Sequence, residues 1–342
     1  MDAAAKTGLP FDDIRNLVKQ MPTADEAARA AALERQGQLT KPPGSLGTLE
    51  DVAVWLAGWQ GQAVPAISRP LCAVFAANHG VVAQGVSAFP AEVTAQMVAN
   101  FSAGGAAVNQ LCSAFDVGLK VFELALEMPT EDITKGPALS EAECAATMAY
   151  GMEAIAGGCD LLCIGEMGIG NTTIAAAIAY GLYGGTAADW VGPGTGLDAA
   201  GVKHKAQVIE AAVALNDGQL DDPLEVLRRL GGREIAAMAG AILAARMSRI
   251  PVLIDGFVAT SAAAVLHAMD ETALDHCWAA HRSAEPAHVH MLEKIGKAPL
   301  LDLGMRLGEG SGAALAVAVI KGALATHGGM ATFTEAGVSD KD

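Results

Sequence analysis

A single acidic residue, Glu309, lies in a glycine-rich stretch near the C-terminus, between Gly308 and Gly310 and shortly before Gly312. Glycines let a backbone turn tightly and let a ligand come close to it. A carboxylate that is partly shielded from water at such a turn has a raised pKa and can accept a proton. Glu309 is therefore a candidate general base, although a solvated carboxylate in a plain loop would show the same pattern.

A second glycine-rich stretch, Ile164–Thr173, leaves a predicted strand, contains Glu166, and enters an alanine-rich helical segment. Backbone N–H groups and hydroxyl side chains at a helix start suit an anion such as a phosphate. The stretch lacks the Gly-Lys-Ser/Thr sequence of a Walker loop and the spacing of the dinucleotide fingerprint. Simple N-capping by Asn171 or Thr172 is the alternative interpretation.

Positive charge for a phosphate is available on a third stretch. The loop of residues 191–198, which contains Gly194, leads into a helical segment that carries Lys203 and Lys205. Solvated surface lysines are the ordinary alternative, but lysine is scarce in this acidic chain. His79 follows the first predicted strand and is a candidate base or ligand, with a structural histidine as the more common outcome.

The elements that position these side chains alternate between strand and helix. Short apolar runs predict buried parallel strands, and most are followed by glycine, polar residues and a helical segment, as in a doubly wound sheet. Ligands bind at the carboxyl ends of the strands in such sheets, where the candidate residues lie. The predicted strands are Leu71–Ala76, Leu119–Leu124, Leu161–Ile164, Val252–Ile254 and Pro299–Leu303.

Composition limits the possible functions. The chain has 342 residues, of which 52% are apolar and 18% charged, and this is typical of a well-packed α/β enzyme. A net charge of −16 gives no basic footprint for nucleic acid or for an anionic membrane surface. The sequence also predicts a cytoplasmic protein, since residues 1–10 lack the pattern of a secretory signal. Its six cysteines are expected to be buried free thiols.

Taken together, these stretches resemble one family over about residues 10–335, the nicotinate-nucleotide–dimethylbenzimidazole phosphoribosyltransferases of cobalamin nucleotide-loop assembly. Each motif is weak alone, but their order along the chain is specific. The motifs are residues 41–50, residues 78–81 with 85–87, residues 93–94, residues 165–173, residues 253–257, residues 283–285 and residues 306–312.

The resemblance implies roles for individual residues. Glu309 occupies the position of the family's catalytic carboxylate, and Glu166 that of a second active-site acid. The positions expected to hold the nucleotide phosphate and ribose, or to line the pocket for the incoming base, are Lys205, Ser283, Met167, Gly168, Gly194, Phe89, Gln96 and Met97. At two places the chain departs from the family pattern, with Asn78 in place of an expected Asp and with Gln96 one residue early on the pocket helix.

The resemblance also implies an overall arrangement. We expect a Rossmann-like catalytic domain of residues 61–314 and a small helical domain from residues 1–60 and about 315–342. Homodimers are expected, with the small domain helping to close the neighbour's site. The implied reaction needs no metal and no cofactor. A non-catalytic nucleotide-binding regulatory module is the alternative, and a Rossmann dehydrogenase is disfavoured by the missing fingerprint.

Overall fold

The structure is a computed structural model and describes residues 8–339. Within these residues, six parallel strands form one sheet in the order β2-β1-β3-β4-β5-β6. This arrangement confirms the parallel α/β sheet that the alternation of strands and helices predicts. The strands are β1 (Pro70–Ala76), β2 (Gly118–Glu123), β3 (Leu161–Met167), β4 (Val252–Ile254), β5 (Cys277–His281) and β6 (Pro299–Leu301).

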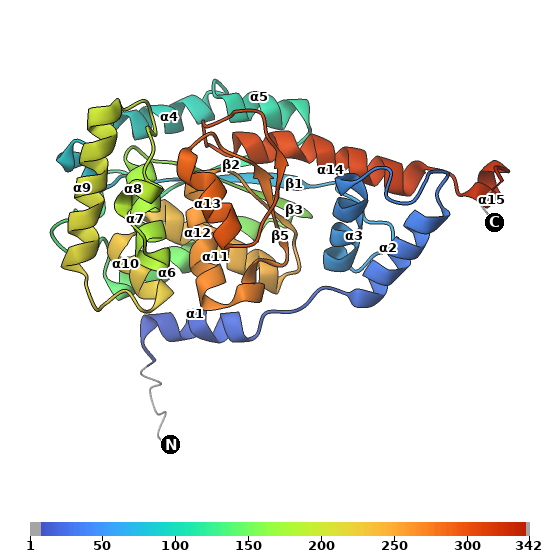
Figure 1. The fold of residues 1–342 in the computed structure, drawn as a ribbon, viewed down its shortest axis with the longest axis horizontal. Helices are drawn as coiled ribbons and strands as arrows, with labels where there is room; N and C mark the ends of the chain where they lie inside the picture. Colours follow the sequence, from blue (N-terminus) through green and yellow to red (C-terminus); the bar gives the residue numbers. More distant parts are fainter. Residues whose placement is uncertain (1–7, 340–342) are drawn as a thin grey trace, which may run out of the picture.

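Helices connect the strands and cover both faces of the sheet (Figure 1). The helices are α1 (Pro10–Lys19), α2 (Glu26–Gln38), α3 (Thr48–Gln60), η1 (Gly80–Gln84), α4 (Glu92–Ser102), α5 (Ala107–Ala114), α6 (Glu141–Met152), η2 (Glu153–Ile155), α7 (Asn171–Tyr183), α8 (Ala187–Trp190), α9 (Ala199–Leu215), α10 (Pro223–Leu230), α11 (Arg233–Met247), α12 (Phe257–Met269), η3 (Glu271–Leu274), α13 (Pro286–Lys294), α14 (Ser311–Gly329) and α15 (Phe333–Ala336).

Side chains of the central strands alternate between two apolar layers, because successive residues of a strand point to opposite faces. On β1, Ala73 and Phe75 belong to the core formed with α6, α7, α11 and α12. Cys72 and Val74 belong to the core formed with α3, α5 and α14. All seven residues of β1 are buried. A parallel sheet covered on both faces in this way leaves only its strand ends open for a ligand.

Helix α14 belongs to the second apolar layer, the one that contains Cys72 and Val74. By length and composition alone it could cross a membrane, but 44% of the apolar window is buried inside the molecule. Ala313, Ala316, Val317 and Ile320 are fully buried in the core beside the sheet. The apolar character of α14 is therefore explained by its packing against β1, β3 and α3.

The C-terminal end of α14 joins the N-terminal helices α2 and α3. Arg35 of α2 donates through Nε to the carbonyl oxygen of His327 at 2.8 Å, and the Gln36 amide contacts His327 Nδ1 at 2.9 Å. Leu39 forms an antiparallel bridge with Thr332. Residues from the two ends of the chain thus form one helical unit at the right of the molecule (Figure 1).

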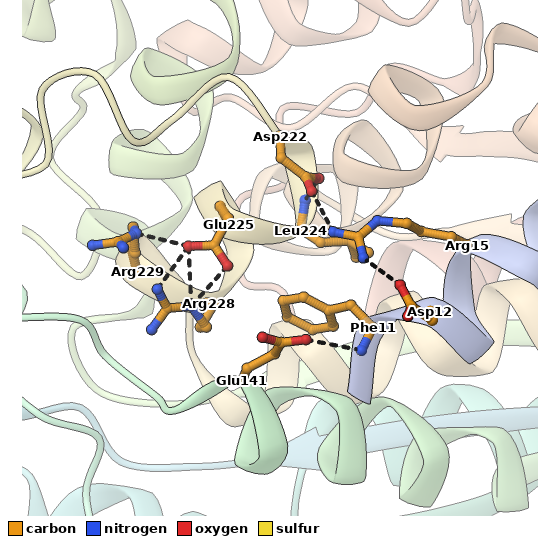
Figure 2. A network of polar contacts seen from close by, with 9 residues as sticks. All are labelled: Phe11, Asp12, Arg15, Glu141, Asp222, Leu224, Glu225, Arg228 and Arg229. Atoms are coloured by element: carbon orange, nitrogen blue, oxygen red, sulfur yellow. Dashed lines mark hydrogen bonds and ion pairs between the residues drawn. The ribbon is translucent and has the colours of Figure 1, made fainter. Parts of the chain in front are cut away.

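Helix α1 lies elsewhere, along the opposite layer of helices. Figure 2 shows the N–H of Phe11 donating to Glu141 of α6 at 3.1 Å, and Arg15 paired with Asp222, which caps α10, at 2.5 Å. Phe11 is fully buried there. These contacts favour grouping α1 with helices α6 and α10, and the wider division into two domains stays a prediction.

Candidate active site

A cavity of about 620 Å³ opens at the carboxyl ends of β3, β4 and β5. This is the edge of a parallel sheet where ligands bind. Most of the residues expected from the sequence line it, although they come from distant segments of the chain. They are Phe89, Met97, Glu166, Met167, Gly168, Gly194, Ser283 and Glu309.

The turn that carries Glu309 has an unusual backbone. Gly308, Glu309 and Gly310 have φ values of 83°, 63° and 74°, all in the left-handed region that L-residues rarely adopt. Asp255, just after β4, holds this turn. Its Oδ2 accepts the N–H of Gly310 at 3.0 Å, and its Oδ1 accepts the N–H of Ala313 at 2.9 Å. The strained conformation at Glu309 is thus maintained by a buried carboxylate outside the turn.

Two acids in the cavity have raised pKa values. Burial, and then the charge of Asp255, raise the pKa of Glu309 to about 7. Burial raises the pKa of Glu166 to about 8, with smaller contributions from Asp255, Glu234 and Glu309, while a hydrogen bond from Asn171 opposes the shift. A carboxylate with a pKa near neutrality is suited to accept a proton in a reaction at neutral pH.

Hydrogen-bond donors gather at the other end of the cavity. Lys205 is buried behind the lining, and its Nζ donates to Thr172 Oγ1 at 2.9 Å and to the carbonyl oxygen of Gly192 at 3.2 Å. Burial lowers the pKa of Lys205 to about 8, and the charge of Glu285 opposes this shift. Thr172 stands in the first turn of α7, where the helix dipole favours an anion.

The mouth of the cavity is apolar. Phe89, Val93 and Met97 line it together with Leu307. Phe89 and Leu307 are 49% and 55% exposed, so both remain available to a further partner or ligand. Gln96 lies on the exposed side of α4, outside the cavity lining, and the structure places Met97 in the lining instead.

His79 lies beside the cavity but does not line it. Its Nε2 is 2.8 Å from Glu234 Oε1, and both side chains are fully buried. This environment favours a structural role for His79, with the carboxylate of Glu234 as its partner. Within residues 8–339, no group of three or more His, Cys, Asp or Glu side chains is arranged to hold a metal ion.

Three residues of the site carried no individual role in the sequence analysis. They are Asp255, which anchors the Glu309 turn, Glu285, which accepts the N–H of Gly194, and Arg306, which donates to the carbonyl oxygen of Gly194. Asp255 and Arg306 follow strands that the sequence predicts, and this position was the available signal, whereas Glu285 follows β5, which the sequence does not predict.

Comparison with known proteins decides the family. A family model described as "Phosphoribosyltransferase" matches residues 21–338. The chain belongs to this family. It is 67% identical to the nicotinate-nucleotide–dimethylbenzimidazole phosphoribosyltransferases of Rhizobium meliloti (strain 1021) and Sinorhizobium medicae (strain WSM419), and each match covers 98% of this chain and 99% of the relative. The match to the phosphoribosyltransferase family thus covers nearly all of the described residues.

A solved structure supports the same assignment. The crystal structure of CobT from Thermus thermophilus superposes with a TM-score of 0.86 at 42% identity, and the match covers 92% of this chain and all of that one. A second structure from that organism, of the nicotinate-nucleotide–dimethylbenzimidazole phosphoribosyltransferase, gives a TM-score of 0.84. The family resemblance drawn from the motifs is therefore confirmed, and with it the enzyme class.

Proposed function

We propose that this phosphoribosyltransferase transfers the phosphoribosyl group of nicotinate mononucleotide to 5,6-dimethylbenzimidazole. The products are α-ribazole 5′-phosphate and nicotinate, and the reaction belongs to the assembly of the cobalamin lower ligand. The observation that carries the proposal is the 67% identity, over 98% of the chain, to enzymes named for this reaction. The raised pKa values of Glu309 and Glu166 in one cavity support it.

In the proposed reaction, one benzimidazole nitrogen attacks C1′ of the nucleotide, and the bond from C1′ to the pyridinium nitrogen breaks. The bonding electron pair returns to the pyridinium ring, which leaves as neutral-ring nicotinate, so no acid has to protonate it. The other benzimidazole nitrogen loses its proton. Glu309, whose pKa is about 7, is the group assigned to accept that proton. Glu166 is assigned to stabilise positive charge at C1′ in its ionised form, which its pKa of about 8 makes the minor form at neutral pH.

The two ends of the cavity suit the two substrates. The nucleotide phosphate is assigned to the end with Lys205, Thr172 and the start of α7, since these groups donate hydrogen bonds and carry positive potential. Ser283 and the backbone at Met167 and Gly168 are assigned to the ribose and phosphate. The benzimidazole, an apolar aromatic base, is assigned to the wall formed by the cavity-lining residues Phe89, Val93 and Met97. The sequence predicts that Gln96 belongs to this wall. The side chain of Gln96 is exposed, however, and this argues against a direct contact with a benzimidazole bound in the same chain.

Nicotinate release tests the proposal. Wild-type protein should release nicotinate from the mononucleotide only when dimethylbenzimidazole is present, and α-ribazole 5′-phosphate should appear in equal amount. A non-catalytic nucleotide-binding module would bind the mononucleotide without releasing nicotinate. Binding without turnover under saturating amounts of both substrates would therefore exclude the enzyme and favour the module.

A homodimer and a cytoplasmic location complete the proposal. Phe89 and Leu307 expose apolar surface at the cavity mouth, which a second copy of the chain would cover. The helical unit made by α2, α3 and the end of α14 is the part assigned to the neighbour's site. The acidic composition is compatible with a cytoplasmic enzyme of small-molecule metabolism.

A further inference from the structure

One carboxylate that lines the cavity has no role in the proposed reaction. Glu285 directly precedes α13, and only 5% of its surface is exposed. Its Oε1 accepts the N–H of Gly194 at 2.6 Å, and its charge acts on Lys205. Glu285 is therefore an anion that the protein itself holds at the end of the cavity where donors gather.

The surrounding groups form a site for an anion. A Cβ atom built on Gly194 would lie 2.7 Å from Thr172 Oγ1 and 3.2 Å from Lys205 Nζ, so these donors meet beside the Gly194 peptide. The N-terminus of α7, a helix of 13 residues, adds a favourable potential at the same place. Such a cluster would bind a phosphate if its donors were free.

Two anions cannot share this cluster at low cost, because like charges a few ångströms apart repel strongly in a buried site. We propose that Glu285 is a built-in competitor for the phosphate: it holds the Gly194 N–H and partly neutralises Lys205, and the nucleotide phosphate displaces it on binding. The inference rests on the proposed function and adds an exchange of anions to it.

The backbone of the loop allows this exchange. Gly194 and Gly196 have φ values of 53° and 118°, in the region that L-residues rarely adopt, so both positions favour glycine. Arg306 Nη1 donates to the carbonyl oxygen of Gly194 at 3.0 Å, on the same residue whose N–H meets Glu285. Arg306 thus holds the Gly194 carbonyl in place while the Gly194 N–H changes its acceptor from Glu285 to the phosphate.

Inorganic phosphate is the probe for the test, measured by calorimetry and as a competitor of nicotinate mononucleotide. Glu285→Gln and Glu285→Ala should bind phosphate about tenfold more tightly than wild type, because the competing charge is gone. The matched control is Glu293→Gln on α13, the helix that Glu285 precedes, where the side chain is 71% exposed. This control loses the same charge and should leave phosphate affinity unchanged.

A damaged fold cannot raise affinity, so tighter phosphate binding by both Glu285 variants would support the exchange. Equal or weaker phosphate binding by both variants would overturn it and leave Glu285 as a structural or ribose-binding group. The wild-type nicotinate-release assay tests the proposed function separately. If wild type turns over but the Glu285 variants do not bind phosphate more tightly, only the exchange of anions is contradicted. If the variants bind phosphate more tightly but wild type does not turn over, only the proposed reaction is contradicted.

Discussion

Glu309 and Glu166 share one cavity, and each raises the cost of charging the other, since the charge of Glu309 is among the causes of the raised pKa of Glu166. Their protons are therefore linked, and titration of the site reports on the pair. The negative charge of Asp255 raises the pKa of both glutamates. Because Asp255 also anchors the N–H of Gly310, the same carboxylate shapes the turn of Glu309 and increases its basicity.

The first prediction concerns the proton acceptor. Glu309→Gln removes the base but keeps nearly the same volume, so fold and nucleotide affinity should be retained. Turnover at saturating substrates should fall on the order of 10²-fold or more, as expected for loss of a general base. Near wild-type turnover in this variant, with both substrates saturating, would remove Glu309 from the mechanism.

The pH profile is the control for that variant. The pKa of Glu309 lies at about 7, above the ordinary value for a glutamate, so about half of the carboxylate is in the basic form at neutral pH and the basic form predominates above it. In wild type, kcat/KM should therefore rise with pH through about 7. This rise of kcat/KM with pH should be absent from the residual activity of Glu309→Gln.

The second prediction concerns Lys205. Lys205→Ala should weaken binding of nicotinate mononucleotide by roughly 1.5–3 kcal/mol, the range for a hydrogen bond to a charged group, and should leave dimethylbenzimidazole binding unchanged. The pKa of Lys205 is lowered to about 8, so its charge is present below this pH and lost above it. Wild-type affinity for the nucleotide should accordingly fall as pH rises past about 8.

Lys203→Ala is the matched control for Lys205→Ala, because Lys203 lies on the same helix with an exposed side chain. Calorimetry with each substrate should show an unchanged affinity in this control. Equal nucleotide affinity in Lys205→Ala and wild type would place the phosphate elsewhere in the cavity.

At the scale of elements, β3 and α14 meet through glycines. A Cβ atom on Gly165 of β3 would collide with the backbone of Gly310, directly before α14. The third prediction is that Gly165→Ala lowers the free energy of unfolding on the order of 1–3 kcal/mol, as expected for overpacking, and also lowers turnover, since the Glu309 turn must shift.

Gly322→Ala on the exposed face of α14 provides the comparison, because nothing lies within 4 Å of its added Cβ. This substitution should raise the free energy of unfolding by roughly 0.5–1 kcal/mol, since glycine inside a helix is unfavourable. Urea unfolding of both variants measures the difference. A Gly165→Ala protein as stable as Gly322→Ala would contradict the tight contact.

The sequence predicted most of these elements but missed one. All five predicted strands start within one residue of the observed strand, but β3 continues to Met167, past its predicted end at Ile164, and β6 ends at Leu301, before its predicted end at Leu303. Strand β5, Cys277–His281, was not predicted. Its sequence is Cys-Trp-Ala-Ala-His, with two alanines and no run of β-branched residues. Its strand conformation follows from pairing with β4 and β6 on either side.

The site was predictable where its residues follow predicted strands, as Glu166 and Glu309 do. The contacts between segments could not be predicted from the sequence. The hydrogen bond from Gly194 to Glu285 joins residues 91 positions apart, and the one from Gly310 to Asp255 joins residues 55 positions apart. Gln96 shows the reverse case: spacing along a helix could not decide which of two neighbouring side chains faces the cavity.

At the scale of the whole molecule, the fourth prediction concerns metal ions. The nicotinate ring leaves as a neutral group from a cationic pyridinium, so its departure requires no divalent ion to neutralise charge. Turnover should be unchanged after treatment with EDTA and dialysis. Strict dependence on added Mg²⁺, restored by titration of the ion, would instead indicate a metal-assisted mechanism.

The last prediction concerns assembly. The turn at Pro42 and Pro43 is exposed, and it is held at its base by Lys41, whose Nζ lies 2.9 Å from Glu50 Oε1. The proposed homodimer places this helical unit against the partner's cavity. Breaking the pair by Glu50→Ala should therefore remove most turnover in the partner's site, since an unpaired buried lysine disturbs the turn.

Mixing tests this arrangement directly. Glu309→Gln has an intact helical unit and no base, whereas Glu50→Ala has an intact base and a disturbed helical unit. Each variant alone should be nearly inactive. Random exchange of equal amounts gives half hybrid dimers, each with one intact site of two, so about a quarter of wild-type activity should return. Sedimentation should show a dimer at the assay concentration. A fully active monomer would mean that each chain closes its own cavity, because a monomer has no neighbour from which to borrow the helical unit.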